Sequence, residues 1–206
     1  MILILALALG SCLLGALLAS ELLSWLPLRP GLLGLALMLS SAVLARRHWQ
    51  RSPQGPGSVE RACWHGLASY SLLAGHLGGL LWRLGPQLDM HSLRGHALAV
   101  DSWTLILGAL LSWQIARDPQ PLRDERDRLF QAAALRTAWH ALTALLVMLI
   151  LALGFGERTP VAGFNQPLIA HLLILLLTLA CVVHEAAQLR LYGLEARLEA
   201  QREAEA

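Results

Sequence analysis

The chain has 206 residues, of which 56% are hydrophobic and 15% charged, and its formal net charge is +2. A soluble domain carries about 25% charged residues, so this composition excludes an ordinary water-soluble fold. The basic residues lie between apolar blocks and never cluster on a soluble face, which argues against nucleic-acid binding. All 16 of them are arginine, a usage that indicates a GC-rich bacterial genome.

The apolar residues occur in blocks, and a helix needs about 20 residues to cross about 30 Å of hydrocarbon. The first block, 2–23, lacks the basic leader of a cleavable signal peptide, so we interpret it as a first membrane span. Pro27 and Pro30 break the chain, and a second span is predicted at 27–45. The segment 46–61 then holds four arginines with Pro53 and Pro56, which indicate a loop.

A third span is predicted at 62–82 and a fourth at 97–115. In the third span, Ser71, Gly75 and Gly79 recur every four residues and form a small-residue ridge that allows another helix to approach closely.

A charged connector at 116–128 follows the fourth span. Asp124 is expected to cap the next helix, and Glu125 and Asp127 add negative charge in its first turn, where the helix dipole favours it. That helix becomes a fifth span at 130–155, and a sixth at 167–188 continues as a helical tail over 189–206. The expected fold is all-α: one polytopic membrane domain, 1–190, that is a compact bundle of six transmembrane helices with a C-terminal cytoplasmic extension.

Orientation is predicted from the arginines, because basic residues in short loops stay on the cytoplasmic side. Eleven arginines lie in the loops after the second and fourth spans and in the tail, against four in the opposite loops. The first group is Arg46, Arg47, Arg51, Arg61, Arg117, Arg123, Arg126, Arg128, Arg190, Arg197 and Arg202, and the second is Arg29, Arg83, Arg94 and Arg158. Both termini are therefore expected in the cytoplasm.

Histidines within the predicted spans raise the hypothesis of a b-type haem or quinone site, since histidines of neighbouring helices can ligate haem iron on both faces. The candidates are His65, His76, His140, His171 and His184. Their depths allow an outer pair of His76 with His171, and an inner pair of His65 with His140 or His184. His171 and His184 are thirteen residues apart, roughly 140° out of phase, which argues against a two-haem helix. The alternative is that each histidine bonds a neighbouring helix or lies at the interface.

A transporter hypothesis depends on Asp101 and His76 as an ion or proton path, with Arg136 and His140 one turn apart near the cytoplasmic side. No internal repeat and no matched pair of broken helices supports it. For Asp101 we favour a residue near the water layer, paired with His96 or with solvent.

The tetrad Asp124, Glu125, Arg126 and Asp127 comes just before the last two spans. Over 102–192 the chain resembles a group of small bacterial multi-span membrane proteins of unknown function, in which an Asp-Glu-Arg-Asp tetrad begins the helix before a span. The resemblance implies an accessory or regulatory membrane protein and assigns no activity or ligand. A capped helix start in a solvated loop explains the tetrad equally well.

No motif in the chain predicts a catalytic residue. The leading hypothesis is a non-enzymatic structural or regulatory component of a complex in the bacterial inner membrane, without a cofactor, whose partners are the lipid bilayer and other membrane or cytoplasmic proteins. It would present the tetrad and the C-terminal helix to a cytoplasmic partner. The alternatives are an electron carrier with haem b or quinone, and a small proton- or ion-coupled transporter.

Overall fold

The computed structural model describes residues 1–20, 22, 28–51, 56–84, 92–118, 124–155 and 164–205. These residues form six helices, which confirms the predicted all-α class. The helices are α1 (Ile2–Leu18), α2 (Pro30–Gln50), α3 (Ser58–Leu84), α4 (Leu93–Ala116), α5 (Glu125–Gly154) and α6 (Gln166–Glu205). Several predicted features lie outside the described residues. They are the breaks at Pro27 and Pro53, the segment 119–123 of the connector, which contains Arg123, and Arg158.

Three of the described helices are long and apolar enough to cross a membrane: α4 over Gly95–Ala116, α5 and α6. The helix α1 is apolar but has only 17 residues. The central helix α3 carries buried serines, glycines and histidines, because it packs against other helices on several sides and needs no lipid-facing composition. The chain is therefore a plausible membrane protein with three candidate spans by length and composition.

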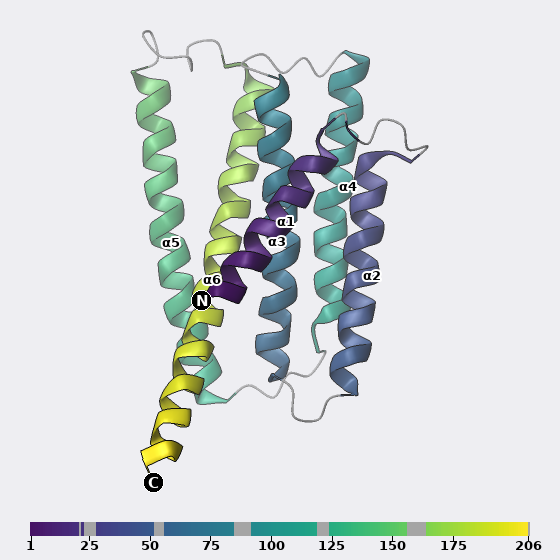
Figure 1. The fold of residues 1–206 in the computed structure, drawn as a ribbon. Helices are drawn as coiled ribbons and strands as arrows, with labels where there is room; N and C mark the ends of the chain where they lie inside the picture. The colour runs from purple at the N-terminus through teal and green to yellow at the C-terminus, as the bar shows by residue number, and fades with distance from the viewer. Residues whose placement is uncertain are drawn as a thin grey trace.

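Successive helices alternate in direction (Figure 1). One end of the row therefore holds the C-terminal ends of α2 and α4, the N-terminal ends of α3 and α5, and the C-terminus of the chain (Figure 1). We call this the tail end. The helices α5, α6, α3, α4 and α2 stand in a row in that packing order, and α1 lies obliquely across α3 (Figure 1). This arrangement is more open than the compact bundle that we expected.

The crossing of α1 over α3 is close because glycines from both helices meet. A Cβ added at Gly75 would overlap the carbonyl of Cys12, and one added at Gly15 would overlap the carbonyl of Leu72. Gly79 lies against Ala16 one turn further along. The ridge predicted from the third span is thus confirmed at Gly75 and Gly79, and α1 is the helix that it receives.

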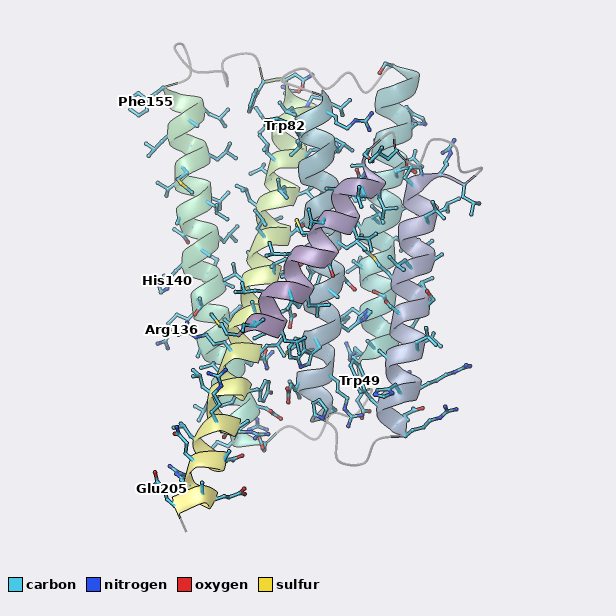
Figure 2. All side chains as sticks on the ribbon, in the orientation of Figure 1. Trp49, Trp82, Arg136, His140, Phe155 and Glu205 are labelled. Carbon is cyan, nitrogen blue, oxygen red and sulfur yellow. The ribbon has the colours of Figure 1, made fainter. Side chains whose placement is uncertain are left out.

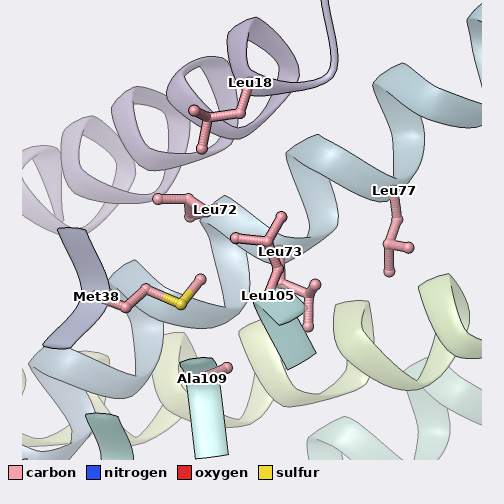
Figure 3. Packing of buried hydrophobic residues seen from close by; sticks show 7 residues of the cluster. All are labelled: Leu18, Met38, Leu72, Leu73, Leu77, Leu105 and Ala109. Atoms are coloured by element: carbon pink, nitrogen blue, oxygen red, sulfur yellow. The ribbon is translucent and has the colours of Figure 1, made fainter. Parts of the chain in front are cut away.

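The helices α2 and α4 pack by similar means. Gly34 receives the side chain of Leu105, and Gly108 lies under Leu35 and Met38. The adjoining core joins four helices, α1 to α4, in one cluster (Figure 3). Its buried members are Leu18, Met38, Leu72, Leu73, Leu77, Leu105 and Ala109.

The first helix ends earlier than the span predicted at 2–23. It stops at Leu18, and the Ser20 hydroxyl donates to the carbonyl of Leu17 at 2.6 Å. The guanidinium of Arg83, at the end of α3, donates to the carbonyl of Ala19. These bonds satisfy carbonyl groups that a helix end leaves without partners.

Helix α5 stands at the edge of the row, and α6 is the neighbour against which it packs (Figure 1). Ala134 and Ala138 are buried there, whereas Leu135, Trp139 and Ile150 are each more than 60% exposed. Small residues on one face let α6 approach, and large apolar residues make up much of the exposed surface of the helix. This outer surface has the composition expected of one that contacts lipid.

Candidate functional site at the tail end

The start of α5 is held against α6 by a polar cluster. The Tyr192 hydroxyl donates to the Asp127 carboxylate at 2.6 Å, and the Gln188 amide lies 3.5 Å from the same hydroxyl. The ring of Phe130 meets that of Tyr192 edge-on, with centroids 5.2 Å apart. Asp127, Gln188 and Tyr192 are all buried. We call Asp127, Phe130, Gln188 and Tyr192 the latch.

Arg126 adds a more exposed layer to the latch. Its guanidinium lies 3.0 Å from Glu195 and 3.5 Å from Asp124, and 5.6 Å from the centre of the Tyr192 ring. Asp124 also caps α5 as predicted, since its carboxylate accepts from the Asp127 amide at 2.7 Å. Three residues of the tetrad, Asp124, Arg126 and Asp127, therefore contact other residues of the same chain. The fourth, Glu125, is exposed.

Tyr192 keeps its proton under ordinary conditions. Burial of the ring, and then the hydrogen bond to Asp127, raise the pKa of this phenol above its usual value of 10.0. A group whose pKa is higher in the folded than in the unfolded chain stabilises the fold. That stability is complete below the unfolded pKa and is lost as the pH rises from there through the folded pKa. Ionisation of the phenol should therefore not break the bond from Tyr192 to Asp127 at any pH below about 10.

The Tyr192→Phe variant tests the latch. It removes the donor to a buried carboxylate, and such a hydrogen bond contributes about 1.5–3 kcal/mol. We expect hydrogen exchange of the amides around residues 186–196 to accelerate by at least about tenfold, since 1.4 kcal/mol corresponds to a factor of ten. The matched control is Glu199→Gln, an exposed change on the same helix. Unchanged protection in Tyr192→Phe would show that the latch does not hold the tail.

A cavity of about 200 Å³ adjoins the latch, between the tail-end halves of α3, α4, α5 and α6. The buried carboxylate of Glu185 lies near the Cys63 thiol, and His184 Nδ1 lies 3.5 Å from the carboxylate. Gly66 leaves room for Glu185, since an added Cβ would lie 3.0 Å from the carboxylate carbon.

The other histidines lie in different surroundings. His65 is buried and 3.2 Å from the Ser69 hydroxyl, and His171 Nδ1 is 2.8 Å from the carbonyl of Pro167. His76 is fully buried, and neither ring nitrogen has a hydrogen-bond partner among the described residues. His140 points away from the row of helices, as does Arg136 (Figure 2).

The structure thus places His65 and His76 inside the fold on α3 and His140 on the outer surface of α5. Within the described ranges, no three His, Cys, Asp or Glu side chains are grouped so that they could hold a metal ion. His76 lines none of the described pockets, so no described cavity places a ligand beside its unpartnered nitrogens.

Asp101 has a structural contact that the sequence did not indicate. The backbone amide of Gly31 donates to its carboxylate, and the charge of Arg29 lies nearby. Gly31 is the second residue of α2, so Asp101 of α4 serves as a cap for the start of another helix. A Cβ at Gly31 would lie only 2.7 Å from Asp101 Cα, which shows how closely α2 and α4 approach here.

Sequence reasoning identified the tetrad and the polar group of His184, Glu185 and Gln188 at the inner end of the sixth span, but it missed Tyr192 and Glu195. The available signal was a tyrosine within an otherwise charged tail, four residues after a glutamine. Comparison with protein families, with curated proteins and with solved structures found no match to this chain.

Proposed function

We propose that this chain is a six-span protein of the bacterial inner membrane, with both termini in the cytoplasm. We further propose a non-enzymatic role, structural or regulatory, in which the tail end binds a cytoplasmic protein. The resemblance carried by Asp124 to Asp127 supports an accessory role of this kind. The three candidate spans and the apolar helix α1 are consistent with a membrane location.

The alternation of helix direction supports the orientation. Described arginines gather at the tail end, among them Arg46, Arg47, Arg61 and Arg117, whereas Arg29 and Arg83 lie at the opposite end. Arginines near span ends are retained in the cytoplasm, so the tail end is the cytoplasmic one in this proposal.

The observation that carries the proposed role is an apolar stripe on the tail. Beyond the latch, α6 continues to Glu205 and projects past the other helices (Figure 1). Leu194 and Leu198 are 44% and 56% exposed there, and a spacing of four residues places them on one face. Exposed leucines aligned on a charged helix are the pattern by which amphipathic helices bind a groove or a second helix. The latch would fix the direction in which this stripe points.

Photo-crosslinking in living cells tests the role. A benzophenone amino acid at Glu199, beside the stripe, is expected to yield one discrete adduct with a cytoplasmic protein, and the double variant Leu194→Ser, Leu198→Ser should abolish it. The control is Arg197→Gln, an exposed change on the same turn. An adduct of twice the chain mass would assign the stripe to self-association. No adduct, or one that survives the double variant, would contradict partner binding through the tail.

A further inference from the structure

A second pocket at the tail end is lined by arginines from three helices. It has a volume of about 120 Å³ and lies where α2 ends, α3 begins and α4 ends. Its principal lining residues are Arg46, Trp49, Ser58, Arg61, Arg117 and Asp118. Ser58, Arg117 and Asp118 also line the larger cavity around Glu185, so the two pockets adjoin.

Backbone carbonyls hold two of these arginines in place. Arg61 donates through Nε to the carbonyl of Pro56 at 2.6 Å and through Nη1 to that of Trp49 at 3.3 Å. Arg46 donates through Nη1 to the carbonyl of Ile115 at 3.2 Å. A carbonyl orients a guanidinium without neutralising it. These bonds use only part of the five N–H groups that each arginine carries, so further donors are available to a ligand.

The pocket has a net positive charge. Three arginines line it against one carboxylate, Asp118, which leaves a formal charge of about +2. The third guanidinium, that of Arg117, stacks on the Trp113 ring at 4.7 Å from its centre. The nearby Glu60 carboxylate accepts from the Trp64 indole at 3.3 Å. Converging, pre-oriented guanidinium groups fit the several oxygens of a phosphate, because each can form two parallel hydrogen bonds with it.

Ser58 adds a feature of a second kind. It is the first residue of α3 and lines the pocket, so the pocket lies where that helix begins. Amides at a helix start lack partners within the helix and attract anions. The arginines and the helix start therefore favour the same ligand chemistry.

We infer that this pocket binds a phosphate group, held by Arg46, Arg61 and Arg117 with Ser58. Its source is the headgroup of an anionic phospholipid such as phosphatidylglycerol. Trp49 supports that source, because an indole at a helix end prefers the headgroup layer of a bilayer. The lipid source rests on the proposed membrane insertion, whereas the phosphate chemistry rests on the pocket alone.

Native mass spectrometry of the purified full-length protein with added phosphatidylglycerol tests the inference. Wild type is expected to retain one phosphatidylglycerol molecule and much less phosphatidylcholine. Arg61→Gln together with Arg117→Gln should reduce that retention at least about tenfold, since it removes two of the three guanidinium groups that would hold the phosphate. The control is Arg47→Gln with Arg51→Gln, which removes two exposed charges near the end of α2 that do not line the pocket.

Arg46→Gln serves as a milder third variant, because the Arg46 side chain is exposed and its loss should leave the fold intact. It is expected to retain less phosphatidylglycerol than the control pair. Equal loss in the control pair would overturn the inference in favour of general attraction to positive charge, and wild-type retention in all variants would overturn it outright. Inorganic phosphate is added as a competitor. If inorganic phosphate binds and phosphatidylglycerol does not, the lipid source is overturned. These readouts do not depend on the cytoplasmic partner, so the two proposals can fail separately.

Discussion

Gly75→Ala is expected to destabilise the protein more than a methyl group added at any other glycine of α3. The new Cβ would overlap the carbonyl oxygen of Cys12 and lie 2.8 Å from the Cα of the same residue. Both are backbone atoms of α1, so the clash can be relieved only by moving the whole helix. Overpacking of a tight contact typically costs about 1–3 kcal/mol, and the lost close approach of α1 adds to it.

Thermal unfolding in detergent measures this effect. A loss of 1 kcal/mol lowers the midpoint by roughly 2–4 °C in a chain of this size, so Gly75→Ala should lower it by several degrees. The matched control on the same helix is Gly78→Ala, where an added Cβ meets nothing within 4 Å. Alanine forms helix better than glycine by about 1 kcal/mol, so the control should be neutral or slightly stabilised. Equal midpoints for the two variants would show that α1 does not pack on α3 in this way.

The contrast between these glycines illustrates what the sequence can predict. The spacing of Ser71, Gly75 and Gly79 correctly indicated a close helix contact, because small residues four apart always share a face. It did not indicate which helix fills the contact. That choice depends on Gly15 and Ala16 of α1 and on Ala19 just after it, whose spacing becomes meaningful only once the two helices are aligned.

The latch shows a similar limit. The cap at Asp124 is local, involving residues three apart, and it was predicted. The bond between Asp127 and Tyr192 joins residues 65 positions apart, and no local sequence pattern predicts such a contact. The charged tetrad therefore suggested a docking site for a partner, although two of its four residues, Arg126 and Asp127, contact the chain's own tail.

Helical phase predicted burial well where a helix is surrounded and poorly where it is not. His65 and His76 are eleven residues apart, a spacing that places them on one face of α3, and both are buried. Arg136 and His140 also share a face, yet that face points outward because α5 stands at the edge of the row (Figure 2). Periodicity gives the direction of a side chain relative to its helix, whereas the place of the helix in the fold decides what the side chain meets.

The central claim is that all six helices cross the membrane with the tail end inside. It predicts the side on which every helix end lies, including those of α1, α2 and α3, whose length or composition alone does not mark them as spans. Single cysteines can report those sides, after Cys12, Cys63 and Cys181 are replaced by alanine. Suitable exposed positions are Leu28 and Gln166 at the opposite end and Gly57, Glu125 and Glu203 at the tail end.

The decisive measurement is labelling of these cysteines with a membrane-impermeant maleimide in intact spheroplasts and again after permeabilisation. Cysteines at Leu28 and Gln166 are predicted to react in intact spheroplasts, and those at Gly57, Glu125 and Glu203 only after permeabilisation. Labelling of Leu28 and Gly57 from the same side would mean that α2 does not cross, and reaction of Glu125 and Gln166 from the same side would mean that α5 does not. Either result would contradict the six-span account.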